Sequence, residues 1–95
     1  MKLQLYSSTS RSAVPNLVSL QDDIFDGLPT VLVCPFGTDL EKTLFRVEVI
    51  WNDSQFVACP ELTRPIHRKA LRPIGQLSET ASREIMNNLL SLLAH

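Results

Sequence analysis

The sequence predicts an all-β to α+β fold, in which short antiparallel strands form a strongly bent sheet or barrel that packs against one C-terminal helix. Three observations lead to this fold class. Short apolar runs, some with the two-residue period of strands, recur over residues 1–58. Turn-forming residues separate these runs. From residue 78 onward the apolar period becomes helical. A chain of 95 residues suits one domain, which we expect over residues 1–95.

Two strands are expected near the N-terminus, and a third begins at residue 30. The alternating leucines of residues 1–6 share one strand face, and residues 15–20 form the next apolar run. Residues 30–34, Thr-Val-Leu-Val-Cys, are rich in β-branched side chains. A central strand buried on both faces has this composition. We therefore expect such a strand here, followed by a mixed loop after Pro35.

A hairpin is expected in the middle of the chain. Apolar and charged residues alternate through residues 45–51, which indicates a half-buried strand. Residues 52–54, Asn-Asp-Ser, form a short turn, and residues 55–58 return as the hairpin partner. This arrangement would bring Trp51 and Phe56 close together across the turn.

A basic segment precedes the C-terminal helix. Residues 64–72, Arg-Pro-Ile-His-Arg-Lys-Ala-Leu-Arg, contain four of the nine Lys and Arg residues. Pro65 and Pro73 keep any helix in this segment short. Such a segment could contact phosphates, but no aromatic residue interleaves with its cations. A solvated connector is therefore the favoured interpretation.

An amphipathic helix of about four turns is expected from Ser78 to the end of the chain. Ser78 suits the N-cap position, and Glu79 favours the helix N-terminus. Apolar residues recur at intervals of four, at Ala81, Ile85, Leu89 and Leu93. The last turns carry a wider apolar face, made by Leu89, Leu90, Leu92 and Leu93. We expect most of that face in the core, with a partner-binding surface as the alternative.

Composition argues against several classes of protein. No apolar run reaches the ~18–20 residues of a membrane span, so no membrane association is expected. A net charge of −1 does not indicate a nucleic-acid-binding protein. The first six residues lack the apolar core of a signal peptide, and we expect a cytoplasmic protein.

No catalytic motif stands out from the residues alone. The three glycines are isolated from one another, which argues against a phosphate-binding loop. His67 and His95 are the two histidines, and we expect both to be solvated. The physical interpretation therefore stops at a small intracellular β-rich domain that binds a partner.

Neither a metal nor a cofactor is expected. Cys34 and Cys59 each lie in an apolar stretch and predict reduced, partly buried thiols, with a disulfide or redox switch as the alternative. Neither thiol has a further ligand at zinc spacing. Asp22, Asp23 and Asp26 could hold a divalent cation, but a polar turn is the favoured interpretation.

Several segments together resemble the CcdB family within the CcdB/MazF (PemK) toxin superfamily. Residues 21–26, Gln-Asp-Asp-Ile-Phe-Asp, look like the family's Gln-x-Asp-Ile-x-Asp stretch at the same distance from the start. Residues 33–36, Val-Cys-Pro-Phe, resemble its Val-Ile-Pro-Leu strand end. Residues 74–78, Ile-Gly-Gln-Leu-Ser, resemble the start of its C-terminal helix. The order and spacing of these segments carry the resemblance over nearly the whole chain.

The resemblance implies an SH3-like barrel of short antiparallel strands with a C-terminal helix. It also implies a homodimer and a cognate antitoxin whose disordered tail wraps the toxin, since folding on binding suits a labile partner. The family resemblance thus implies the toxin component of a bacterial type II toxin–antitoxin pair.

CcdB-type toxins poison DNA gyrase through the last residues of the C-terminal helix, where the family carries Trp-Gly-Ile. Matching the helices from Ser78 places Leu93, Ala94 and His95 at these positions. A leucine thus stands where the family has an aromatic anchor, and aromatic anchors often dominate binding energy. The resemblance implies gyrase binding by Leu93, Ala94 and His95 without an enzymatic reaction.

MazF-type toxins instead cut single-stranded RNA, with an Arg before a Pro on the second strand and a Thr after the third. Val14 precedes Pro15 at the first place, where a guanidinium would stabilise phosphate charge. Arg11 is the nearest arginine, and Thr38 stands near the second place. A MazF-like endoribonuclease using Arg11 and Thr38 is therefore the alternative function. A degenerate toxin that retains only antitoxin binding is a third.

Overall fold

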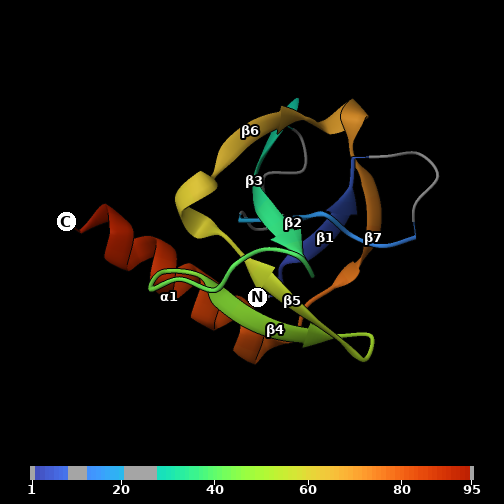
Figure 1. The fold of residues 1–95 in the computed structure, drawn as a ribbon. Coiled ribbons are helices and arrows are strands. Elements are labelled where there is room, and N and C mark those ends of the chain that lie inside the picture. Colours follow the sequence, from blue (N-terminus) through green and yellow to red (C-terminus); the bar gives the residue numbers. More distant parts are fainter. Residues whose placement is uncertain (1, 9–12, 21–27, 95) are drawn as a thin grey trace.

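Seven strands of one curled antiparallel sheet make up much of residues 2–8, 13–20 and 28–94, which are the residues that the computed structural model describes (Figure 1). In chain order the elements are β1 (Gln4–Ser7), β2 (Leu17–Ser19), β3 (Thr30–Gly37), β4 (Val47–Trp51), β5 (Ser54–Ala58), the 3₁₀ turn η2 (Pro60–Leu62), β6 (Arg64–His67), the 3₁₀ turn η3 (Arg68–Ala70), β7 (Arg72–Gln76) and α1 (Glu79–Leu93). The strands pair in the order β4-β5-β3-β2-β1-β7, and β6 also pairs with β3. The expected all-β to α+β fold, with one C-terminal helix, is confirmed.

Strand β3 is central to the sheet, but it is not buried on both faces along its length as expected. Leu32 is 44% exposed, whereas Val31 and Val33 on the opposite face are buried. Beyond Val33 the buried side changes, and Cys34 and Phe36 enter a different apolar cluster. Because the curled sheet encloses two clusters, β3 contributes one face to each of them in turn.

The loop expected after Pro35 begins later, because β3 continues through this proline to Gly37. The amide of Phe36 donates to the Asn16 carbonyl at 3.0 Å, and the Pro35 carbonyl accepts from the amide of Cys59 at 3.0 Å. Both hydrogen bonds extend the sheet past the proline. The strand therefore ends next to Thr38 rather than at Cys34.

The expected hairpin is present as β4 and β5. Trp51 pairs with Ser54, so the turn itself contains only Asn52 and Asp53. Their φ angles of 51° and 63° are those of the tight primed turns that suit the twist of a hairpin. The rings of Trp51 and Phe56 lie edge to face with centroids 6.1 Å apart, which confirms their predicted proximity.

The segment predicted as a solvated connector, residues 64–72, is instead ordered by the sheet. β6 pairs with Thr30–Val33 of β3, and β7 pairs with β1. Both are outermost strands, where a proline can lack its N–H without breaking the ladder. His67 is exposed as expected, and its Nδ1 accepts from the Lys69 amide at 3.4 Å.

Helix α1 begins where the sequence predicts. The Ser78 hydroxyl accepts a hydrogen bond from the Ala81 amide at 3.1 Å, which caps the helix. One turn later, the buried Ser82 hydroxyl accepts from the Leu3 amide at 2.9 Å. Ile85 is fully buried in the larger apolar cluster beside Leu5 and Val47. The first half of the helix is therefore fixed to the sheet.

Candidate functional site

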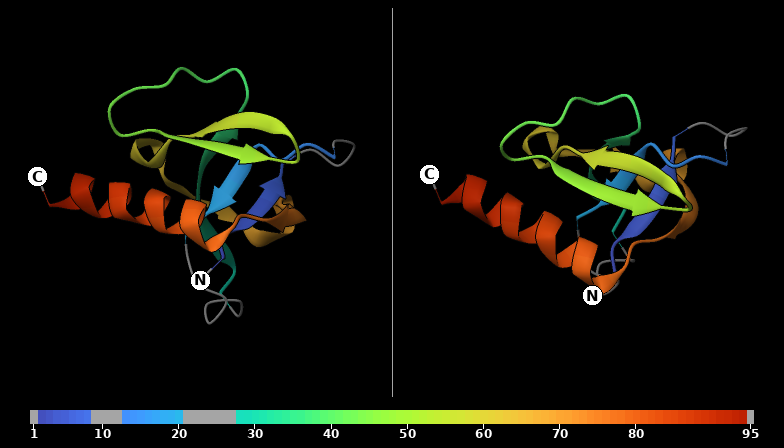
Figure 2. Two further views of the ribbon diagram at one scale, coloured as in Figure 1. Left: turned by 90° about the horizontal axis from the view of Figure 1, so that it is seen from below. Right: turned by 60° about the horizontal axis from the view of Figure 1, so that its bottom comes forward.

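The last turn of α1 extends past the sheet and ends in solvent, whereas Leu89 just before it still packs against the larger apolar cluster (Figure 2). Ile85 is fully buried, but Leu90 is 58% and Leu93 is 73% exposed. The expectation that this terminal face lies mostly in the core is therefore wrong for these two leucines. The sheet is too narrow to cover the last turns, so the apolar pattern continues beyond its packing partner.

Two of the three residues proposed from the helix end lie on this projecting tip. Leu93 is the last residue of α1, and the exposed Ala94 follows as its C-cap, with its amide bonded to the Leu90 carbonyl at 3.1 Å. His95 lies outside the described residues. No basic residue occupies the last turn, so the partial negative charge of the helix end is not offset there. The tip thus presents leucines beside carbonyl oxygens.

A groove of about 300 Å³ lies where β3 ends. Thr38 and Val14 both line it, so the fold brings together the two positions compared with the Thr and Arg of MazF-type toxins. Asn16 lies in the same groove, and its amide group exchanges two hydrogen bonds with Ser8, at 2.9 and 2.7 Å. Arg11 lies outside the described residues.

The described lining of this groove is largely apolar, with a few polar side chains and one acid. Among its described lining residues, Asp39 carries the one formal charge, and no Lys or Arg is present. Phe36 and Phe56 line the same groove and stack with centroids 4.5 Å apart. A phosphate in this groove would meet a carboxylate and no described cation, which is unfavourable for phosphodiester cleavage.

Sequence reasoning missed Asn16 and Asp39 as groove residues. Asn16 reaches the groove because of two backbone hydrogen bonds. Its backbone amide donates to the Tyr6 carbonyl, and its backbone carbonyl accepts from the Phe36 amide, which links the chain before β2 to β1 and β3. That pairing depends on contacts between distant segments. The residue types alone give no signal for it.

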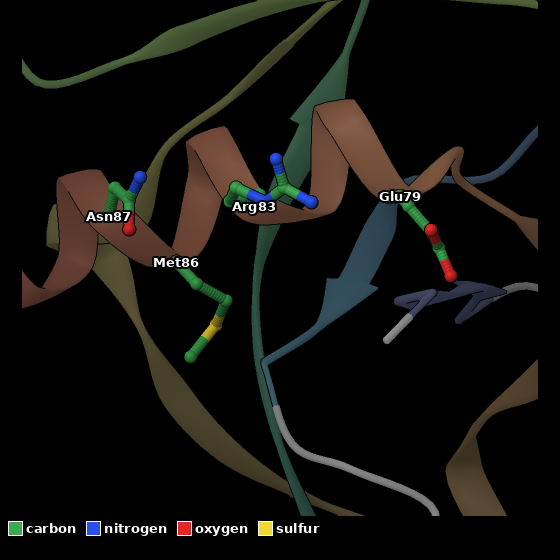
Figure 3. Close-up of a pocket in the computed structure, with 4 residues that line it drawn as sticks. All are labelled: Glu79, Arg83, Met86 and Asn87. Carbon is green, nitrogen blue, oxygen red and sulfur yellow. The ribbon is translucent and has the colours of Figure 1, made fainter.

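A second hollow, of about 190 Å³, lies along one face of α1 (Figure 3). Its described lining is Glu79, Arg83, Met86 and Asn87, which recur at helical spacing. Glu79 and Arg83 lie on successive turns of the helix, so the hollow offers one negative and one positive charge and selects neither an anion nor a cation. This hollow therefore ranks below the helix tip and the Thr38 groove as a functional site.

The thiols and acids provide no further reactive centre in the described residues. Cys34 and Cys59 are both free, as predicted, and they are fully rather than partly buried. Burial raises the pKa of the Cys34 thiol to about 12, so it stays protonated and unreactive at neutral pH. Within residues 2–8, 13–20 and 28–94, no three His, Cys, Asp or Glu side chains gather to hold a metal ion. Asp22, Asp23 and Asp26 lie outside these ranges.

No helix in the described residues has the length and apolar character that crossing a membrane requires. No protein-family model matches the chain, and no curated protein matches its sequence. Among solved structures, the chain is similar to the crystal structure of MazE–MazF (form II) from Deinococcus radiodurans. The TM-score is 0.72 at 14% identity, over 97% of this chain and 89% of that chain. This similarity shows a MazF-like barrel fold and confirms the predicted barrel.

Proposed function

We propose that the chain is the toxin component of a type II toxin–antitoxin pair, and that it poisons DNA gyrase through the tip of α1. The observation that carries this proposal is the pair of exposed leucines, Leu90 and Leu93, on a helix that projects from the sheet. Exposed apolar side chains clustered on one element typically mark protein contact sites. The contacting residues are Leu93, Ala94 and His95, with Leu90 one turn earlier.

A protein partner that restrains the toxin belongs to the same proposal. The similar solved structure is a MazE–MazF complex, and this supports a cognate antitoxin for the present chain. A homodimer is proposed with it. Neither partner requires a cofactor.

The Thr38 groove supports the gyrase mechanism indirectly. A ribonuclease of MazF type needs a cation close to the scissile phosphate, and the described lining of the groove supplies only Asp39 as a formal charge. Contact through the helix tip requires no such group. The non-enzymatic mechanism therefore fits the described residues better.

The direct test mixes purified protein with DNA gyrase, ATP and supercoiled plasmid, and scores double-strand breaks trapped in the presence of the protein. Linear plasmid should form with the full-length chain and disappear when residues 93–95 are deleted. The deletion removes no buried residue among those described, so circular dichroism should report an unchanged fold.

A matched variant identifies the surface that acts. Ile50→Ala removes a side chain that is 79% exposed, close to the 73% of Leu93, but from β4 instead of the helix tip. Leu93→Ala should reduce linear plasmid, whereas Ile50→Ala should not. Equal loss in the two variants, or full activity of the deletion, contradicts the assignment to the helix tip. If expression does not arrest growth, the chain is a degenerate toxin that retains only antitoxin binding.

Cleavage of single-stranded RNA is the second candidate, because Thr38 and Val14 share one groove. In this mechanism Thr38 contacts the scissile phosphate and Arg11 supplies the missing cation. RNA should then be cut by the wild type and not by Thr38→Ala or Arg11→Ala. Thr43→Ala is the control, since Thr43 is an exposed threonine of the β3–β4 loop and does not line the groove.

A further inference from the structure

The charges of this chain are separated between two sides of the fold. Residues 62–78 contain four Lys and Arg residues and no Asp or Glu, whereas the rest of the chain has five against ten. These cations lie on β6, η3 and the first residue of β7, along the upper edge of the barrel in Figure 1, from which β7 runs back toward β4 and α1. We call Arg64, Arg68, Lys69 and Arg72 the basic strip. The described acidic residues lie on α1, η2, the β4–β5 hairpin and the β3–β4 loop.

The backbone beneath the basic strip is held in place by hydrogen bonds. β6 and β7 pair with interior strands of the sheet. At the corner between them, the amide of Arg68 donates to the Pro29 carbonyl at 2.8 Å, and its Nε donates to the Leu28 carbonyl at 2.9 Å. The backbone that carries the cations is therefore already ordered, so that a ligand needs to order only the exposed side chains.

Three of the four cations of the strip reach solvent. Arg64, Lys69 and Arg72 are exposed. Within the described residues, Arg64 and Lys69 form no ion pair, in contrast to Arg46, whose Nε lies 3.0 Å from a carboxylate oxygen of Glu61. The strip spans roughly 20 Å along two extended segments and a 3₁₀ turn. Each cation can thus meet a different phosphate of an extended polyanion.

We propose that the basic strip binds the phosphodiester backbone of a nucleic-acid duplex without reading its sequence. This binding is separate from the function proposed above and uses a different surface. A duplex fits because its phosphates face outward and need only cations. Single strands are usually bound with aromatic side chains that stack on bases, and residues 62–78 contain no Phe, Tyr or Trp.

A membrane surface fits the strip less well than a duplex. Peripheral membrane binding combines cations with apolar side chains that enter the bilayer. Ile66, Leu71 and Ile74 of this region are instead half-buried, and the first two pack on the Val31 and Val33 cluster. The exposed leucines beside the strip, Leu28, Leu32 and Leu62, are each less than half exposed, so they offer less surface to a bilayer than the cations offer to phosphates. Anionic vesicles are therefore included in the test.

The test measures fluorescence anisotropy of a labelled random-sequence DNA duplex of roughly 24 base pairs over a range of salt concentrations. If three to four cations contact phosphates, a plot of the logarithm of the binding constant against the logarithm of the salt concentration should have a slope of about −3. The double variant Arg64→Gln, Lys69→Gln should lower the magnitude of this slope by about 2 and weaken binding at low salt by at least about tenfold.

The control variant also removes two positive charges, but from residues outside the basic strip. Lys42 lies in the β3–β4 loop and Arg83 lies on α1, and both are exposed. Lys42→Gln, Arg83→Gln should bind the duplex within about twofold of wild type. Equal weakening by the two double variants would mean that only net charge matters and would overturn the proposal. No duplex binding at low salt, tighter binding to a single strand of equal length, or binding to anionic vesicles alone would also overturn it.

Discussion

Leu3 and Ser82 join the two ends of the described chain through one buried hydrogen bond. The amide of Leu3 donates to the Ser82 hydroxyl at 2.9 Å, and both residues are fully buried. Leu77 adds a second link, because its amide donates to the Leu3 carbonyl at 2.9 Å. The first strand and the helix N-terminus are thus held together at residues 79 positions apart.

Replacing Ser82 with Ala should destabilise the protein by about 1–3 kcal/mol, because the buried Leu3 amide loses its acceptor. Urea unfolding followed by circular dichroism measures this change. Ser91→Ala is the matched control, since Ser91 is an exposed serine of the same helix. It should leave the free energy of unfolding unchanged or raise it slightly, because Ala favours helix. Equal effects of the two variants would contradict a structural role for the Ser82 hydroxyl.

A second stability prediction concerns Gly75, which lies beneath the indole of Trp51. A Cβ at Gly75 would lie 3.0 Å from Cζ2 of Trp51, so the ring must move. Gly75→Ala should cost about 1–3 kcal/mol, as overpacking does, and should shift the emission of the single tryptophan. Gly37→Ala should cost less, because its new Cβ would meet only side-chain ends of Asp39 and Leu40. If Gly75→Ala changed neither the free energy of unfolding nor the tryptophan emission, the packing of Trp51 on Gly75 would be contradicted.

The buried Cys34 thiol predicts a loss of stability at alkaline pH. Burial raises its pKa from 9.0 to about 12, so the native state holds the thiol proton after the unfolded state releases it. Between these two values the unfolded state binds fewer protons, and the free energy of unfolding falls as pH rises. The slope approaches about 1.4 kcal/mol per pH unit. Urea unfolding at about pH 8 and pH 10 should show a smaller decrease for Cys34→Ala than for wild type. Identical decreases would rule out a contribution from this thiol.

The sequence was sufficient for the parts of the fold that depend on local pattern. The Ser78 cap, the Asn52–Asp53 turn and the Trp51–Phe56 contact follow from residue type and spacing, and each is present. β6 and β7 were missed because prolines and charges interrupt the alternation that marks a strand. Their pairing with β3 and β1 depends on distant segments, which a local pattern does not encode.

The candidate site was predictable only in part for a related reason. Helical periodicity places Ile85 and Leu93 on one apolar face, but it does not say where the covering sheet ends. The structure shows that Ile85 is fully buried and Leu93 is 73% exposed. The resemblance compares Val14 and Thr38 with two family positions, but their meeting in one groove, with Asp39 beside them, depends on contacts between distant strands and is known only from the structure.

The helix tip permits a test in which stability and activity change in opposite directions. Leu90→Lys and Leu93→Lys together place two cations in a last turn that has none. Cations near a helix C-terminus each stabilise it by about 0.3–1 kcal/mol. Lysine keeps much of the helix propensity of leucine, and its aliphatic stem replaces part of the lost contact. The free energy of unfolding should therefore stay equal to that of wild type or rise.

Gyrase poisoning by the same double variant should fall by at least about tenfold, because a charged side chain replaces each apolar contact. Ser91→Lys is the matched control, since it adds a cation to the helix end and keeps both leucines. It should stabilise the helix and retain linear plasmid formation. If Ser91→Lys also abolishes activity, added charge accounts for the loss and the leucines are not the contact. If the double variant remains active, the contact lies away from Leu90 and Leu93.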